Sequence, residues 1–264
     1  IRPWQLIFML LGALGVAFSL LLFLLKEPQR KGVGAGARVP LRDVIAYVKL
    51  NRSTVLLHNL GFAGVAFCGY GAAAWIPEFF VRTYGLSRVQ VGEWLGWITM
   101  IGGSAGILTG GALSDWLRAK GYQDASMRVG CLAAVLMLPT LPGYLASDPF
   151  WALFANAISV FCLAMPFGVA PAALQEIMPN PMRGQASALY LFVVTLIGLG
   201  VGPTAVALIT DFVFQDDGAL RYSLMIVCAV AGTLAALLLF LSFKPYRESL
   251  QRLENWTQAG TPSL

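Results

Sequence analysis

The chain has 264 residues, of which 58% are hydrophobic and 12% are charged, about half the charged fraction usual for soluble domains. The mean hydropathy of +0.72 excludes an ordinary soluble protein and predicts an all-α integral membrane protein. The net charge of +5 is interpreted below as membrane topology rather than nucleic-acid binding.

Seven apolar runs follow along the chain, and each is long enough to cross a bilayer. A helix that rises ~1.5 Å per residue crosses a ~30 Å hydrocarbon core in about 20 residues. Barrel strands would be shorter and would alternate apolar with polar residues, which these runs do not. The first run is also too long for the core of a signal peptide. We therefore predict seven transmembrane helices, at residues 4–25, 54–80, 91–113, 129–146, 150–174, 186–209 and 223–243.

The longest polar segment, residues 26–52, lies between the first and second predicted helices. Its glycine-rich part at 32–36 is followed by an amphipathic pattern at 41–49. This order predicts a flexible linker that leads into an interfacial helix, with a plain connector as the alternative.

Lysine and arginine residues are distributed unequally between the two sides of the seven predicted helices. Fourteen fall on the side of residues 26–52, and four fall on the other side. Because the richer side of a membrane protein is cytoplasmic, we expect the N-terminus outside and the tail from Lys244 inside. The odd number of helices and the start at Ile1 predict that the chain is part of a longer protein.

Glycine, proline and cysteine residues within the apolar runs predict how the helices pack. Small residues at four-residue spacing let helix backbones approach closely in lipid. The glycines expected at helix contacts are Gly102, Gly106, Gly110, Gly198 and Gly202. Pro166, Pro171 and Pro203 should break or bend their helices. The four cysteines lie in apolar runs without metal-ligand spacing, so we expect packing roles, no metal and no cofactor.

A charged loop separates the third and fourth predicted helices. Its segment 111–120, Gly-Ala-Leu-Ser-Asp-Trp-Leu-Arg-Ala-Lys, resembles the loop signature of the major facilitator superfamily, although Leu117 stands near a position where that family has glycine. Glu176, followed after six residues by Arg183, is similar to the second cytoplasmic pattern of the same family. Segments 75–87, 181–190 and 198–203 look most like its Spinster-like branch.

The resemblance covers essentially the whole chain and implies a twelve-helix transporter of which this chain holds the C-terminal half. Residues 1–25 would be the sixth helix, 26–52 the cytoplasmic linker between the two halves, 53–244 the C-terminal six-helix bundle, and 245–264 a cytoplasmic tail. The implied partners are a small-molecule substrate, the lipid bilayer, the missing N-terminal six-helix bundle and H⁺ as a candidate coupling ion. The implied location is the inner (plasma) membrane of a bacterium, which the chain crosses several times.

Charged residues at the helix ends predict a cytoplasmic gate. Asp115 ends the third predicted helix and Arg183 opens the sixth on the same side, so an ion pair between them could hold that side closed. The four candidate gate residues are Asp115, Arg118, Glu176 and Arg183. The alternative is that these charges only sit among lipid headgroups and set the topology.

Polar and aromatic residues at helical spacing predict a substrate cavity. In the second predicted helix such residues form one stripe with a step of three or four, although a helix contact explains the stripe nearly as well. The candidate cavity residues are Asn59, Phe67, Tyr70, Asn156, Tyr190 and Thr195.

The middle of each predicted helix lacks Lys, Arg, Asp and Glu. A coupling group for H⁺ or Na⁺ is therefore expected in the missing half, and an uncharged or amphipathic solute fits these helices better than an anion. His58, near the inner edge, is interpreted as a packing or interfacial residue. The function predicted is secondary active or facilitative transport by alternating access. A seven-helix receptor and an intramembrane enzyme fit less well, because the last helix has no lysine and no nucleophile–base or metal cluster lies at depth.

Overall fold

The computed structural model describes residues 2–24 and 40–258, and every regular element within these ranges is a helix. The chain divides into two units, Ile1–Ala37 and Arg38–Leu264, which are described separately. The first unit contains α1 (Pro3–Leu20), which continues into the 3₁₀ turn η1 (Leu21–Leu24). It is apolar on all sides, as expected for a helix long and apolar enough to cross a membrane. The predicted glycine-rich linker at 32–36 lies outside the described residues.

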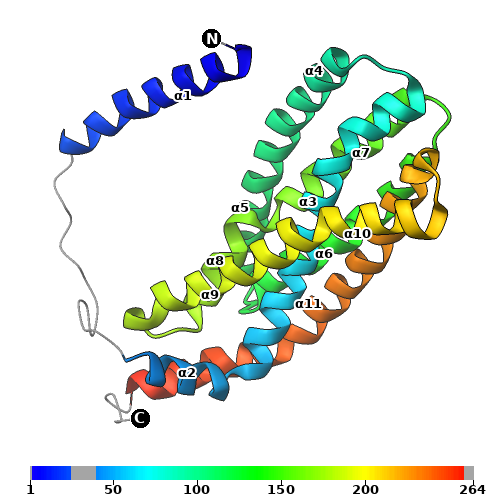
Figure 1. Ribbon diagram of the computed structural model, residues 1–264. Coiled ribbons are helices and arrows are strands. Elements are labelled where there is room, and N and C mark those ends of the chain that lie inside the picture. Colours follow the sequence, from blue (N-terminus) through cyan, green and yellow to red (C-terminus); the bar gives the residue numbers. More distant parts are fainter. Residues whose placement is uncertain (1, 25–39, 259–264) are drawn as a thin grey trace. The chain divides into compact units, whose positions relative to one another are not determined.

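The second unit is a bundle of helices, several of which continue into π or 3₁₀ turns (Figure 1). Its α-helices are α2 (Leu41–Leu50), α3 (Arg52–Tyr84), α4 (Arg88–Ile98), α5 (Ser104–Ala119), α6 (Ala125–Met137), α7 (Pro149–Ala164), α8 (Pro166–Glu176), α9 (Arg183–Thr195), α10 (Gly202–Leu208) and α11 (Leu220–Gln258). Its π turns are η2 (Thr99–Gly103), η5 (Leu196–Val201) and η6 (Ile209–Phe214), and its 3₁₀ turns are η3 (Leu138–Leu145), η4 (Asn180–Met182) and η7 (Asp217–Ala219).

Six helical runs in the described ranges are long and apolar enough to cross a membrane. They are Trp4–Leu24, Arg52–Tyr84, Ala125–Leu145, Pro149–Glu176, Asn180–Phe214 and Asp217–Asn255. These runs correspond to six of the seven predicted helices. The remaining predicted helix, at 91–113, lies inside the continuous run α4–η2–α5, which is helical from residue 88 to 119 but is not among the six. Its polar and glycine residues lower its hydropathy, so six runs rather than seven in the described ranges have the length and composition of a membrane span.

Proline and capping residues set several helix boundaries in the second unit. α7 begins at Pro149 after Asp148, whose carboxylate accepts the backbone N–H of Phe150, as a helix N-cap does. α7 ends at Ala164 and α8 starts at Pro166, so the expected break in this run occurs at that proline. Pro203 likewise lies at the start of α10, directly after the π turn η5.

Glycines allow close contact between helix backbones at two places in the second unit. On α5, a Cβ added at Gly106 would lie 3.1 Å from the carbonyl carbon of Phe161, and one at Gly110 would lie 2.8 Å from that of Met165. A Cβ at Gly202 would lie 2.9 Å from the carbonyl oxygen of Phe67 on α3. Gly198 packs against Tyr70. The contact of Gly102 with α7 is looser, because an added Cβ would lie 3.5 Å from the carbonyl oxygen of Ala157. Glycine at these positions brings the helix axes together.

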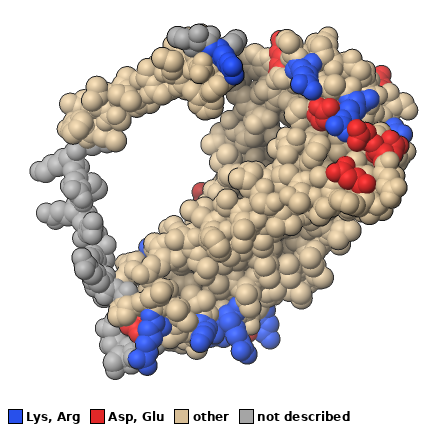
Figure 2. All heavy atoms as spheres, in the orientation of Figure 1, with Lys and Arg blue, Asp and Glu red and all other residues tan. Residues whose placement is uncertain are grey.

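The second unit has two opposite ends. The α2 end holds α2, the starts of α3, α6 and α9, and the last residues of α5, α8 and α11 (Figure 1). Figure 2 shows that the charged side chains visible on one face gather mainly at the two ends, with lysine and arginine predominant at the α2 end and both signs at the other. An uncharged band lies between them, as required of a surface that faces hydrocarbon.

The helix α2 is fixed to the bundle by Tyr47, which is 2% exposed and donates a hydrogen bond of 2.9 Å to the carbonyl oxygen of Ile177. Burial raises the pKa of Tyr47 to about 12, although the hydrogen bond with Asn51 and the charge of Arg252 act in the opposite direction. Because the unfolded pKa is about 10, the stability linked to the neutral phenol is fully present below about pH 10. It is lost as the pH rises from about 10 to about 12.

We therefore expect alkaline pH to weaken the attachment of α2. Between about pH 10 and 12 the full-length protein should lose up to about 2 kcal/mol more stability than its Tyr47→Phe variant, which has no phenol to ionise at this position. The measurement is the thermal unfolding midpoint of both proteins across this range. Parallel pH profiles would mean that Tyr47 ionises without affecting the folded state.

Candidate functional site

An ion pair joins α5 to α8 at the α2 end of the second unit. The Nη2 atom of Arg118 donates to Oε1 and Oε2 of Glu176 at 2.5 and 2.7 Å, and also to Oγ of Ser126 at 3.1 Å. The phenol oxygen of Tyr246 on α11 lies 2.9 Å from Oε2 of the same glutamate. Four helices, α5, α6, α8 and α11, are therefore joined through one carboxylate and one guanidinium group.

A second ionic cluster surrounds Asp124, which is fully buried just before α6. Its Oδ1 accepts from Nε of Arg128 at 2.8 Å, and its Oδ2 accepts from Nη1 of Arg247 at 3.0 Å. The Arg128 guanidinium also lies over the ring of Tyr122, 4.3 Å from its centroid. Asp124 thereby connects the start of α6 to the last third of α11.

The other two candidate gate residues are placed differently. Asp115 is exposed on α5, and no ion pair in the described ranges includes it. Arg183 is exposed at the start of α9, where its Nε donates to the carbonyl oxygen of Met178 at 3.4 Å. Among the described residues the structure therefore pairs Arg118 with Glu176 and does not pair Asp115 with Arg183.

Three of the six candidate cavity residues line one cavity of about 120 Å³, the aromatic cavity. Tyr70 of α3, Tyr190 of α9 and Thr195 at the end of α9 face it together with Pro166 and Pro171 of α8. Its wall includes the proline-containing helix α8, so movement of that helix would change the shape of the cavity. Hydroxyl groups and aromatic rings in this wall can contact a neutral or amphipathic solute.

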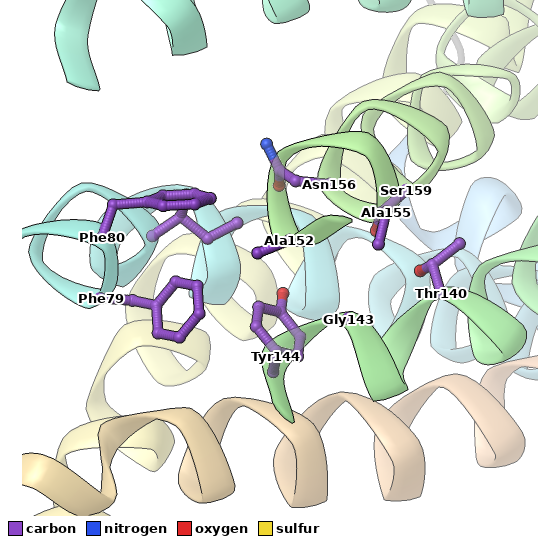
Figure 3. A pocket seen from close by; sticks show the side chains of 10 residues that line it. Phe79, Phe80, Thr140, Gly143, Tyr144, Ala152, Ala155, Asn156 and Ser159 are labelled. Carbon is purple, nitrogen blue, oxygen red and sulfur yellow. The ribbon is translucent and has the colours of Figure 1, made fainter. Parts of the chain in front are cut away.

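A fourth candidate, Asn156 of α7, lies between two other cavities. One is a small space of about 10 Å³ that it lines together with Thr140, Tyr144 and Ser159 (Figure 3). The other, of about 570 Å³, is also lined by Ser159 and by Thr99 of the π turn η2. The buried Oδ1 atom of Asn156 has no hydrogen-bond partner among the described residues. Asn156 can therefore accept a further hydrogen bond at this position.

The remaining two candidates lie elsewhere. Phe67 faces an apolar groove between α3, α10 and α11, where its neighbours include Leu60, Ile209 and Val230. Asn59 is 5% exposed and its Oδ1 lies 3.0 Å from Nδ1 of His58. The residues of the predicted stripe on α3 therefore have different surroundings. Tyr70 lines the aromatic cavity, Phe67 lines the apolar groove, and Asn59 forms an internal hydrogen bond.

Sequence reasoning did not find Asp124, and it treated His58 as a packing residue. For Asp124 the available signal is Arg128, four residues later on the same helix, which is the spacing of an intrahelical ion pair. For His58 the local signals are Asn59 and Phe62, which contact it from the same helix, whereas its partners Ala170 and Tyr190 are more than 100 residues away in the chain.

The chain is similar in sequence to one protein family and to two named transporters. Residues 1–203 match the profile of the Major Facilitator Superfamily. The chain is 26% identical over 249 residues to an "MFS-type efflux pump" of Mycolicibacterium smegmatis, covering 94% of this chain and 58% of that protein. It is 21% identical over 264 residues to a "Probable L-galactonate transporter" of Escherichia coli, covering 94% and 57%. The chain thus spans somewhat more than half the length of these relatives.

Two solved structures share the fold. Both are of a bacterial homologue of the human lysosomal transporter Spinster in an inward-facing conformation. The unoccupied form matches with a TM-score of 0.66 and 20% identity, covering 93% of this chain and 60% of that chain. The occupied form matches with a TM-score of 0.57 and 19% identity, covering 94% and 58%. At this level of identity the likeness concerns the fold.

Proposed function

The chain belongs to the major facilitator superfamily, and on this premise we propose that it is the C-terminal part of a twelve-helix transporter that moves a small organic or amphipathic solute by alternating access. The prediction of this family from the charged loop is confirmed, and the fold is that of a Spinster homologue. The chain is part of a transporter and not an enzyme. The single observation that supports the proposed solute best is the aromatic cavity, whose polar side chains are uncharged.

Seven membrane-crossing helices remain our proposal for the topology. The run α4–η2–α5, helical from residue 88 to 119, is longer than the about 20 residues that a bilayer requires. Packing of its glycines Gly106 and Gly110 against α7 and α8 supports a place within the bundle. With α1 as the sixth helix of the whole transporter, the other six runs would form the C-terminal bundle, and the alignments to about 58% of the relatives fit this division.

We place the α2 end of the bundle in the cytoplasm of a bacterium, with the N-terminus of the chain outside its inner membrane. Fourteen of eighteen lysines and arginines on that side support this orientation. Residues 26–52, which include α2, would link the two halves, residues 53–244 would form the transport bundle, and residues 245–264 would be a tail. The last helix α11 extends into this tail as far as Gln258.

The candidate gate residues act in two ways in this proposal. Arg118 and Glu176 belong to the same bundle, so their ion pair holds the end of α8 against α5 rather than joining the two halves. Asp115 and Arg183 are exposed at the same end and would pair with the missing N-terminal bundle when the cytoplasmic side is closed. Ion pairs of this kind can bias an alternating equilibrium by about 1–3 kcal/mol.

The proposed substrate contacts are Tyr70, Tyr190, Thr195 and Asn156. The aromatic cavity has no lysine or arginine with which to bind a carboxylate. An uncharged or amphipathic solute, as an efflux pump could export, therefore fits it better than a galactonate-like anion. Asn59 and Phe67 are not included among the substrate contacts, because Asn59 is bonded to His58 and Phe67 faces the apolar groove between α3, α10 and α11.

Alternating access can be tested without knowing the solute. In full-length protein with Thr195→Cys as the only reactive cysteine, Asp115→Asn should raise the rate of labelling by a membrane-impermeant maleimide from the cytoplasmic side about fivefold or more. The reason is that the loss of one gate charge favours the inward-open state. Inside-out and right-side-out vesicles separate the two faces.

The matched control is Glu248→Gln, which removes a carboxylate from an exposed pair with Arg252 on α11. It should leave both labelling rates unchanged, because a surface pair within one helix is worth little. If Asp115→Asn also left both rates unchanged, the gate would have to be abandoned.

A further inference from the structure

The inference concerns His58, the sole histidine of the chain. It is fully buried in α3, and both of its ring nitrogens have oxygen neighbours. Nδ1 lies 3.0 Å from Oδ1 of Asn59, and Nε2 lies 2.9 Å from the carbonyl oxygen of Ala170 on α8. A neutral imidazole carries only one N–H, so it can donate to only one of these two acceptors.

Two arrangements satisfy every hydrogen bond at this position. In the first, the ring is protonated and donates from both nitrogens, to Asn59 and to Ala170. In the second, the ring is neutral and donates only from Nε2, and the side-chain amide of Asn59 is turned over so that its NH₂ group donates to Nδ1. The carbonyl of Ala170 accepts in both. The two states therefore differ by one proton on Nδ1 and by one half-turn of the Asn59 amide.

The imidazole of His58 is in T-shaped contact with two aromatic rings. The centroid of the Phe62 ring lies 4.9 Å away and that of the Tyr190 ring 5.3 Å away. No ion pair in the described ranges includes His58, so a proton there would not be repelled by a bonded cation.

The titratable groups on the helices packed around His58 are few. On α9 the facing group is the phenol of Tyr190. On α8 and α11, Glu176 and Tyr246 lie beyond it toward the α2 end, where Tyr246 is bonded to Glu176 and Glu176 is also bonded to Arg118. The phenols remain neutral near pH 7 and Glu176 is paired with Arg118, so the imidazole of His58 is the group in this region whose ordinary pKa lies nearest neutrality.

The site is connected to the aromatic cavity. Phe62 and Tyr190, whose rings contact His58, both line that cavity, and Ala170 directly precedes Pro171, which lines it too. A charge gained by His58 would lie directly behind the wall of this cavity.

We propose that His58 and Asn59 form a reversible proton-binding site in the C-terminal bundle. A proton from water in the cavity binds to Nδ1, the ring gains one positive charge, and the amide of Asn59 turns from donor to acceptor. Release reverses these steps, so no other reactant is needed. The site provides a proton-binding group in the half of the transporter whose helices lack central carboxylates. Its existence does not depend on the identity of the solute.

The test is the ring NMR spectrum of ¹³C,¹⁵N-histidine-labelled full-length protein in nanodiscs, without added solute, from about pH 5 to 8.5. The His58→Gln variant assigns the signal of His58. If that variant does not fold, Phe62→Leu assigns it by the loss of a ring-current shift. We expect a neutral ring protonated only on Nε2 at high pH and a doubly protonated ring at low pH.

Asn59→Leu should lower the proton affinity of His58 at least tenfold, because protonated Nδ1 then has no acceptor. The matched control, Asn180→Leu, replaces an exposed asparagine between α8 and α9 and should leave the titration unchanged. A single neutral tautomer throughout the pH range, or an unshifted titration in Asn59→Leu, would overturn the proposal. Such a result would leave the gate and the transport function untouched, since those are tested by labelling.

Discussion

Gly110→Ala is expected to disrupt the second unit more than any other single-methyl addition on α5. The new Cβ would overlap the carbonyl oxygen of Met165 and would lie 2.8 Å from its carbonyl carbon and 2.9 Å from its Cα. Because these are backbone atoms between α7 and α8, no rotamer change can make room for the methyl group. The helices must separate, at an expected cost of about 3 kcal/mol.

Gly111→Ala is the matched control, because a Cβ at the next residue meets no atom within 4 Å. That change should be neutral or stabilise the helix by up to about 1 kcal/mol. The measurement is the thermal unfolding midpoint and folded yield of the full-length protein in detergent. Equal midpoints for the two alanine variants would show that α5 and α8 are farther apart than described.

The second large effect is expected from the double variant Arg128→Gln/Arg247→Gln. It leaves the carboxylate of Asp124 fully buried and without either of its guanidinium partners. An uncompensated buried charge costs several kcal/mol, but both arginines are about a third or more exposed, so we expect a loss of about 2 kcal/mol. Thermal unfolding of the full-length protein measures this loss.

Adding Asp124→Asn to that double variant should restore part of the lost stability. The third substitution removes the buried charge while keeping a side chain of the same shape. A triple variant more stable than the double one would mean that the unpaired carboxylate, rather than lost packing of the arginines, causes the damage. A triple variant less stable than the double one would contradict this explanation.

The fold was largely predictable because its determinants are local. Apolar length identifies the helical runs, Pro166 marks where one of them breaks, and Pro203 follows a π turn within a continuous run. The extent of the last helix was not predictable. Pro245 and the polar residues after it suggest a tail, yet the helix continues because Tyr246 and Ser249 are buried in the bundle. The energy that extends the helix comes from tertiary contacts, which a local pattern does not contain.

For the candidate gate, the sequence could predict only that charged residues gather at the α2 end of the bundle. The sequence places Asp115, Arg118, Glu176 and Arg183 near the same membrane face, but the choice of partners depends on side-chain direction. Arg118 and Glu176 meet because α5 and α8 pack directly against each other. The hydrogen bond from His58 to Ala170 depends on a contact between α3 and α8 that spans 112 residues, so no spacing rule could reveal it.

The π turns have a consequence for how the chain tolerates length changes. A π turn closes its hydrogen bond one residue later than an α turn, so it holds one residue that a regular helix would not need. Deleting one residue from η2 or η5 could therefore be absorbed by conversion to α-helix, with the residues beyond it keeping their faces. Elsewhere in the same runs a deletion would rotate every later side chain by about 100°. These turns are the points at which the helices that carry Thr99 and Thr195 could gain or lose a residue during evolution without exchanging their cavity-facing and lipid-facing sides.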